Sequence, residues 1–196
     1  MPQPLVLGSS SPFRRELLER LHLPFVSASP DIDEQSLPNE SAYEMVKRLS
    51  EAKARAIAKD YPHALIIGSD QCAVLGDTVL GKPGRHEVAR QQLRALSGHS
   101  VIFLTGLCLY DSQTDTFELD VIPFTVEFRH LSDTEIENYL LKEQPYHCAG
   151  SFKSEGLGIS LFKRMQGDDP SALIGLPLIR LMEMLRHKGW IIPSAA

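Results

Sequence analysis

Polar and basic side chains that could bind an anion follow the first apolar run of the chain. Residues 5–8 are apolar, and residues 9–15 bring three serines, a proline and two arginines. Ser11 can cap a helix that begins at Pro12, because the N–H that proline lacks would have no partner at the first helical position. Free N–H groups, serine hydroxyls and the Arg14 guanidinium would then converge, as they do in a phosphate site. A capped surface helix with solvated arginines fits the same residues.

Acidic and basic residues further along the chain could complete such a site. Asp70 follows the apolar run 64–69, where a rigidly held carboxylate could activate water or bind a divalent cation. Lys53 and Lys82 could hold phosphate oxygens, and Glu34 could share a cation with Asp70. Taken singly, Asp70 could cap a turn and the other three could be solvated surface residues. Together they fit nucleotide phosphate chemistry, although spacing alone does not bring them together.

The periodicity of apolar residues predicts alternating strands and helices that would position these side chains. Strands are predicted at 5–8, 25–27, 64–69, 101–110 and 117–128, and helices at 12–21, 41–60, 86–96, 132–142 and 176–187. Two of these helices open with a capping box, a serine three residues ahead of a glutamate. These pairs are Ser41 with Glu44 and Ser132 with Glu135.

The order of these elements predicts an α/β fold with a mixed, twisted sheet, flanking helices and a cleft between two lobes. The runs 101–110 and 117–128 indicate an antiparallel hairpin, and a smaller hairpin is expected through Gly76-Asp77. The strand 64–69 would present Asp70 and Gln71 at its carboxyl end, where open α/β sheets place ligands. Because no linker or repeat interrupts the chain, residues 1–196 are predicted to form one domain.

Composition narrows the class of partner. The hydrophobic content of 43% and charged content of 23% are typical of a globular protein. A net charge of −5 argues against general binding to nucleic-acid polymers or membrane surfaces, which usually needs a basic excess. A small anionic substrate remains possible, because local arginines and a metal ion can set the field of a pocket. No apolar run approaches the ~18 residues of a membrane helix, and the N-terminus lacks a signal-peptide pattern.

Cysteines and histidines give no sign of a metal centre. Cys72, Cys108 and Cys148 are widely spaced and form no zinc-binding pattern, so we expect reduced thiols and a cytoplasmic protein. His130 and His147 also lack ligand spacing and are expected to be ordinary surface or packed residues. Cys148 is expected to be a buried thiol and not a nucleophile, because hydrolysis at phosphorus needs only a metal and activated water.

Six short motifs occur in order along nearly the whole chain. They are Ser9-x-Ser11-Pro12-x-Arg14, Asp33-Glu34, Glu51-Ala52-Lys53-Ala54, Ile67-Gly68-Ser69-Asp70, Gly81-Lys82-Pro83, and Ala149-Gly150 with Gly156. Together they resemble the Maf family of nucleotide pyrophosphatases. The resemblance implies an α/β fold similar to that of the inosine-triphosphate pyrophosphatases, with a deep cleft, and metal-dependent cleavage of a nucleoside triphosphate to the monophosphate and diphosphate. It also implies that Asp70 is the proton acceptor and that the substrate and metal site is lined by Ser9, Arg14, Glu34, Lys53 and Lys82.

Three positions depart from the family members that act on dTTP and UTP. Those members have arginine, threonine and glutamine where this chain has Phe13, Gln71 and Glu155; this chain resembles the branch that hydrolyses 7-methyl-GTP. N7-methylation makes guanine cationic, and an aromatic face attracts a cation by about 0.5–2 kcal/mol. Glu155 could accept hydrogen bonds from the guanine N1–H and amine, and its charge complements the base. Phe13 could instead belong to the apolar side of its helix, and Glu155 could be a solvated loop residue.

The leading hypothesis is hydrolysis of 7-methyl-GTP to 7-methyl-GMP and diphosphate, with Mg²⁺ or Mn²⁺ as the cofactor and with its ligands unassigned. Two alternatives remain. One is a pyrophosphatase of the same family acting on dTTP and UTP, and the other is a non-catalytic nucleotide-binding regulator of cell division. The expected partner is a small modified nucleotide, with no nucleic-acid polymer and no membrane, and a homodimer is a common arrangement for such enzymes.

Overall fold

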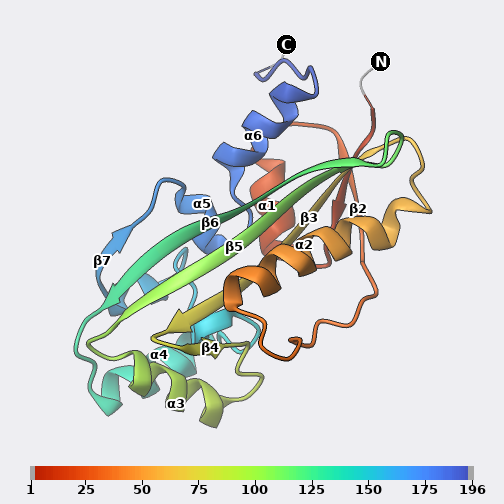
Figure 1. Ribbon diagram of the computed structural model, residues 1–196. Helices are drawn as coiled ribbons and strands as arrows, with labels where there is room; N and C mark the ends of the chain where they lie inside the picture. Colours follow the sequence, from red (N-terminus) through yellow and green to blue (C-terminus); the bar gives the residue numbers. More distant parts are fainter. Residues whose placement is uncertain (1–2, 194–196) are drawn as a thin grey trace.

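The computed structural model describes residues 3–193 and has a mixed seven-stranded sheet at its centre (Figure 1). The strands are β1 (Leu5–Gly8), β2 (Phe25–Ala28), β3 (Leu65–Leu75), β4 (Thr78–Leu80), β5 (Ser100–Asp111), β6 (Thr116–Phe128) and β7 (Phe162–Gln166). They lie in the order β2-β1-β3-β5-β6-β7, and β4 pairs with β3. β1 runs parallel to β2 and β3, whereas the other neighbouring strands are antiparallel. The predicted mixed sheet and both predicted hairpins are confirmed.

Helices connect these strands and cover the sheet. The helices are α1 (Pro12–Glu19), α2 (Ala42–Ala58), α3 (His86–Leu96), α4 (Asp133–Glu143), α5 (Pro170–Ile174) and α6 (Leu178–His187), with the 3-10 helices η1 (Ala149–Ser151) and η2 (Leu157–Leu161). Both predicted capping boxes are present. At α2, Ser41 Oγ accepts from the Glu44 N–H and the Glu44 carboxylate accepts from the Ser41 N–H; Ser132 and Glu135 do the same at α4. The boxes satisfy N–H groups that have no partner inside the helix and fix where each helix begins.

Successive residues of the central strands face different helices, as the pleat of a strand requires. On one face, Ile66 of β3 packs with Ala54 and Ile57 of α2. On the other face, Ile67 belongs to a cluster with Leu17 of α1 and the apolar side of α6. The central strands are therefore buried on both faces, which explains why residues 64–67 form a continuous apolar run.

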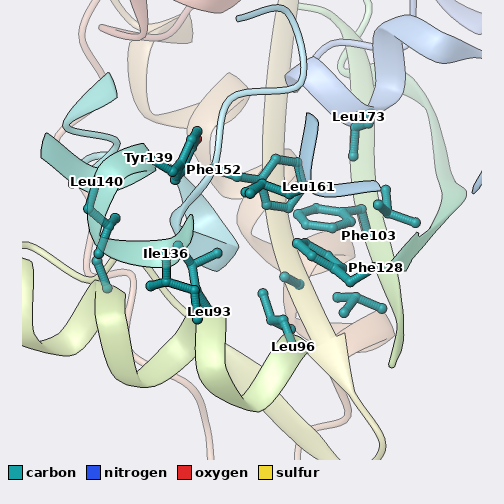
Figure 2. Close-up of a cluster of buried hydrophobic side chains, with 14 of the residues drawn as sticks. Leu93, Leu96, Phe103, Phe128, Ile136, Tyr139, Leu140, Phe152, Leu161 and Leu173 are labelled. Carbon is teal, nitrogen blue, oxygen red and sulfur yellow. The ribbon is translucent and has the colours of Figure 1, made fainter. Parts of the chain in front are cut away.

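A separate apolar cluster lies under the neighbouring helices α3 and α4. Figure 2 shows Phe103 of β5 and Phe128 of β6 close to Phe152, with Leu93 of α3 and Tyr139 of α4 in the same cluster. The ring of Phe152 meets those of Phe103 and Phe128 edge to face, at centroid distances of 5.2 and 5.5 Å. Aromatic pairs favour this arrangement, so Phe152 firmly anchors the chain that follows it.

The prediction that a strand ends at Ser69 is wrong. β3 continues to Leu75, so Asp70 and Gln71 lie inside the strand and not at its carboxyl end. Residues 69–71 are polar, which is typical of a strand end. In this strand the residues are polar for another reason, because neither β1 nor β4 pairs with this part of β3.

The C-terminal part differs more from the prediction. Neither β7 nor α5 was predicted, because β7 has the polar composition of an edge strand and α5 has only five residues. The last helix begins at Leu178 and not at 176, since Pro177 occupies its N-cap position. The short helix α5 matters for the site, because its carbonyl groups contact β3 and α1.

Helix α2 approaches the sheet closely because two glycines face it. A Cβ atom on Gly68 would lie 2.1 Å from the carbonyl oxygen of Ser50, and one on Gly106 would lie 2.4 Å from that of Val46. Gly106 of β5 is the register partner of Asp70 in β3. At this contact, Ser50 Oγ accepts a hydrogen bond of 3.0 Å from the Asp70 N–H. The missing side chains thus bring α2 directly beside Asp70.

We expect Gly68→Ala to lower the free energy of unfolding by about 1–3 kcal/mol or more, because the new methyl group overlaps the backbone of α2. Thermal unfolding followed by circular dichroism measures the change. Gly81→Ala is the matched control, since no heavy atom lies within 4 Å of its Cβ position. Equal unfolding temperatures for the two variants would contradict the close contact.

Candidate active site

A gap along one edge of β3 is the structural basis of the site. On that edge, β1 pairs with β3 as far as Gly68, and β4 pairs with it from Ala73 onward. Residues 69–72 have no strand beside them there in the described part of the chain, while β5 pairs with the opposite edge. A cavity of about 660 Å³ is lined by the end of β1, by Asp70 and Gln71, and by the chain after β4. Small-molecule sites commonly have this size, and they lie at the carboxyl ends of parallel strands such as β1.

The nine residues singled out from the sequence all line this one cavity. They are Ser9, Phe13, Arg14, Glu34, Lys53, Asp70, Gln71, Lys82 and Glu155. They come from α1, α2, β3 and four connecting segments. The fold therefore brings together side chains that sequence spacing alone could not relate.

The first polar group of the cavity is the N-terminus of α1. Ser11 caps this helix as predicted, with its hydroxyl accepting from the Arg14 N–H at 3.4 Å, and Pro12 follows it. Ser9 Oγ accepts from the Ser11 N–H at 3.1 Å and from Arg14 Nη1 at 3.4 Å. The arrangement supplies hydroxyls, a guanidinium and a helix N-terminus to one wall, which suits an anionic group.

Arg14 is held in place by the end of α5. Its Nε donates to the carbonyl oxygen of Gly175 at 2.7 Å, and Ser69 Oγ donates to the same oxygen at 3.0 Å. Burial lowers the pKa of Arg14, while the charges of Asp70 and Glu34 act in the opposite direction. A guanidinium nevertheless stays protonated near neutral pH. Arg14 thus presents a fixed positive charge to the cavity.

Lys53 links the two carboxylates of the site. Its Nζ lies 2.6 Å from Asp70 Oδ1 and 2.9 Å from Glu34 Oε1. Lys53 and Asp70 are buried, whereas Glu34 is exposed. Partial burial raises the pKa of Glu34, but the hydrogen bond and charge of Lys53, with the charges of Lys82 and Arg14, outweigh it and lower the net pKa. Glu34 is therefore a carboxylate near neutral pH.

The donor set fits a divalent cation that also binds substrate. In the described residues, no group of three or more histidine, cysteine, aspartate or glutamate side chains could hold a metal. Mg²⁺ commonly takes only one or two carboxylates and completes its coordination with water and substrate phosphate oxygens. Glu34 and Asp70, both within 3 Å of Lys53 Nζ, offer such a pair. The residues present fit a metal held jointly with a phosphate chain.

The segment that carries Glu34 is fastened to α2 by Arg48. The guanidinium binds both carboxylate oxygens of Glu40, through Nε at 2.5 Å and Nη2 at 2.8 Å, and Nη2 also donates to the carbonyl oxygen of Gln35 at 3.0 Å. Two parallel bonds between Arg and a carboxylate fix geometry well. The hydrogen bond from Arg48, together with one from the Leu37 N–H, lowers the pKa of Glu40 to about 2. Sequence reasoning missed Arg48, since an arginine on a helix resembles any solvated side chain.

Gln71 is anchored on the opposite side of β3 from Asp70. Its Nε2 lies 3.0 Å from Thr105 Oγ1, 2.8 Å from the carbonyl oxygen of Ala172 and 3.0 Å from that of Leu173. Because carbonyl oxygens can only accept hydrogen bonds, the NH₂ group of the Gln71 side chain must be the end that faces α5. The amide oxygen has no hydrogen-bond partner within residues 3–193 and lies in a side chain that lines the cavity. The amide oxygen of Gln71 therefore stays free to accept a hydrogen bond.

Phe13 and Glu155 complete the set of cavity-lining residues expected from the sequence. Phe13 is half-buried at the start of α1 and is not among the buried residues that pack around Leu17 and Leu18. Glu155 is exposed, and its carboxylate accepts from Ser154 Oγ at 3.3 Å. Both side chains line the same cavity as Arg14, Lys53 and Lys82. An aromatic face and a carboxylate thus lie within one cavity with the cations.

The histidines and the cysteine that were not expected to take part in chemistry, and the second arginine of α1, differ in whether they line the cavity. Arg15 pairs with Glu19 on the exposed side of α1, and His130 is exposed. His147 and Cys148 line the cavity. Burial raises the pKa of the Cys148 thiol to about 11, which keeps it protonated and unreactive near neutral pH.

The carbonyl groups of α5 are the other partners that sequence reasoning missed. They hold Arg14, Ser69 and Gln71 at once, through Gly175, Ala172 and Leu173. Asp169-Pro170 is the local sign of this helix, since Asp169 caps it by accepting from the Ser171 N–H at 2.9 Å.

The chain matches known proteins over nearly its whole length. A family model described as Maf-like protein matches residues 4–188. A 7-methyl-GTP pyrophosphatase from Pseudomonas fluorescens is 60% identical over 190 residues, which cover 97% of this chain and 99% of the relative. Relatives of the same name from Nitrosococcus oceani and Pseudomonas aeruginosa are 58% and 57% identical, covering 96% of this chain and 95% and 98% of their own lengths. No helix within residues 3–193 is long and apolar enough to cross a bilayer. The family resemblance of the sequence motifs is confirmed, and the chain belongs to the Maf-like protein family.

Proposed function

We propose that this protein hydrolyses 7-methyl-GTP to 7-methyl-GMP and diphosphate. The observation that carries the proposal is a single cavity with Arg14, Lys53 and Lys82 on its walls together with Phe13 and Glu155. Three cations suit a triphosphate, and an aromatic face with a carboxylate suits a cationic purine. Relatives at 57–60% identity over nearly their full length carry the name 7-methyl-GTP pyrophosphatase.

At the phosphate end, Asp70 is the group we assign to proton transfer. It accepts a proton from the water that attacks the α-phosphorus, while the bond between that phosphorus and the bridging oxygen breaks and diphosphate leaves. Arg14, Lys53 and Lys82 hold the triphosphate in line and stabilise the charge that develops on its oxygens. A bound Mg²⁺ or Mn²⁺, with Glu34 and Asp70 as the available carboxylates, would neutralise further phosphate charge.

At the base end, Phe13 and Glu155 distinguish the methylated purine. The ring of Phe13 attracts the positive charge of N7-methylguanine, and Glu155 accepts from the N1–H and the exocyclic amine. A pyrimidine has neither the charge nor the paired donors. The carbonyl oxygen of Gln71 adds an acceptor, since α5 occupies its amide nitrogen.

The wider setting of the enzyme is also a proposal. We assign residues 1–196 to one domain whose two lobes enclose the cavity. Free Cys72, Cys108 and Cys148 suit a reducing cytoplasm, where nucleoside triphosphates are found. A homodimer and the absence of nucleic-acid and membrane partners stay predictions.

Initial rates of diphosphate release on 7-methyl-GTP, GTP, UTP and dTTP test the proposal, measured with Mg²⁺ and with Mn²⁺. We expect the highest kcat/KM on 7-methyl-GTP. Faster turnover of UTP and dTTP would favour the pyrimidine pyrophosphatase instead. Absence of hydrolysis on every substrate would favour a nucleotide-binding regulator.

Asp70→Asn tests the catalytic assignment. The amide keeps the size of the side chain and an oxygen for Lys53 but cannot take the proton, so kcat is expected to fall about 10²- to 10⁴-fold. Affinity for a non-hydrolysable 7-methyl-GTP analogue, measured without added Mg²⁺ or Mn²⁺, should not fall, because the substitution removes a negative charge from a site that binds phosphate. Asp77→Asn, in the exposed turn between β3 and β4, is the matched control with wild-type kcat. Undiminished hydrolysis by Asp70→Asn would remove Asp70 from this role.

Two substitutions test base recognition. Phe13→Leu keeps an apolar side chain but loses the ring, so kcat/KM for 7-methyl-GTP is expected to fall about 2- to 30-fold, the range of a cation–π contact. Glu155→Gln should likewise lower the ratio of kcat/KM for 7-methyl-GTP to kcat/KM for GTP, because a charged acceptor becomes neutral. GTP is the internal control, since its base is uncharged. An unchanged ratio of kcat/KM between 7-methyl-GTP and GTP would exclude either residue from specificity.

A further inference from the structure

Glu143, at the end of α4, binds the segment that carries Glu155 on both sides of that residue. Glu143 Oε2 accepts from the Leu157 N–H at 2.9 Å, and Glu143 Oε1 lies 3.3 Å from Lys153 Nζ. The side chains of Lys153 and Glu143 are only 26% and 19% exposed. One carboxylate thus binds the chain two residues before Glu155 and two residues after it.

The helix strengthens this attachment. Lys153 Nζ also donates to the carbonyl oxygen of Glu143 at 3.3 Å, which places a cation at the negative end of the α4 dipole. Tyr139 lies one turn earlier on the same face of α4, and its hydroxyl accepts from the Lys153 N–H at 3.0 Å. Phe152, just before the segment, is buried in the aromatic cluster of Figure 2. The start of the segment is therefore fixed by packing and by hydrogen bonds.

Two glycines let the segment lie against its anchor. A Cβ atom on Gly156 would be 2.9 Å from Glu143 Oε2 and 3.0 Å from Oε1, and one on Gly158 would be 2.2 Å from the carbonyl oxygen of Lys153. A side chain at position 156 would displace the Glu143 carboxylate, and one at position 158 would disrupt the turn of the segment back onto Lys153. The close contact leaves the Glu155 carboxylate, whose hydrogen bond comes from its neighbour Ser154, at the cavity.

We propose that Glu143 is a positioning residue for nucleotide specificity, which holds segment 153–158 so that Glu155 meets the base. This inference rests on the proposed recognition of the base by Glu155. A carboxylate on an exposed loop would lose conformational freedom when it binds, and this loss weakens binding. Glu143 orders the loop before the nucleotide arrives, without touching the nucleotide. It therefore acts on substrate preference and not on the chemical step.

Hydrogen exchange at the Leu157 amide tests the attachment directly. In Glu143→Ala the amide loses its acceptor, and its exchange is expected to become about 10-fold faster or more. The control is Glu127→Ala on β6, which removes a carboxylate paired with Lys163 at 2.7 Å and should leave this amide unchanged. Unchanged exchange in Glu143→Ala would overturn the proposal.

A double-mutant cycle with Glu155→Gln tests the role in specificity. In Glu143→Ala, the preference in kcat/KM for 7-methyl-GTP over GTP is expected to fall about 3- to 10-fold, through a higher KM at nearly constant kcat. In the Glu155→Gln background, Glu143→Ala should lower the preference little further, because both residues act through one carboxylate. Glu143→Gln keeps an oxygen for the Leu157 N–H, so its preference in kcat/KM for 7-methyl-GTP over GTP should lie between those of the wild type and Glu143→Ala. Additive losses, or a fall in kcat without a change in preference, would overturn the positioning role.

This inference and the proposed function fail in different ways. A wild-type enzyme without any preference for the methylated base would contradict base recognition, and with it a role for Glu143 in specificity. A preference that Glu155→Gln reduces and Glu143→Ala leaves intact would overturn only the positioning role. Faster exchange at Leu157 together with a non-additive cycle supports both.

Discussion

The close approach of α2 to the sheet is the contact on which the site depends. Gly68 and Gly106 leave no side chain between β3, β5 and the backbone of α2. Ser50 can then accept from the Asp70 N–H, and Lys53, three residues later on the same helix, reaches the Asp70 carboxylate at 2.6 Å. Any side chain in this layer would widen the gap between helix and strand. Buried ionic groups are costly when separated, so the distance between Lys53 and Asp70 bears on both stability and chemistry.

The pleat of β3 divides the functions of adjacent residues. Asp70 faces α2 with Gly68, whereas Gln71 faces α5 with Ser69. Both still line one cavity, because the edge of β3 has no strand partner between β1 and β4 in the described chain. A gap in strand pairing thus lets a ligand contact both faces of one strand. In a fully paired sheet, neighbouring strands would separate the side chains of the two faces.

Much of this arrangement was predictable from local signals. The capping boxes at Ser41 and Ser132 depend on residues only three positions apart. The continuous apolar run 64–67 indicates by its composition that the strand is buried on both faces. The motifs pointed to six of the predicted site residues, and departures from the family pattern pointed to Phe13, Gln71 and Glu155, but neither could give the path of the strand through Asp70. Polar residues inside β3 resemble a strand end, because the open edge is made only when distant strands pair with β3. The α5 carbonyls that hold Arg14 and Gln71 have no signature, since every residue carries a carbonyl group.

The two ends of the cavity are built with different rigidity. At the end where we propose that phosphates bind, Lys53 and Asp70 are buried and tied to regular elements, which suits chemistry that needs fixed geometry. At the base end, Glu155 is exposed on a segment outside regular strands and helices, and its order depends on Glu143. A substitution at Glu155 therefore leaves the packed layer beneath α2 intact, whereas one at Gly68 disturbs it. Under the proposed function, substrate preference can therefore change at Glu155 without loss of the buried contact between Lys53 and Asp70.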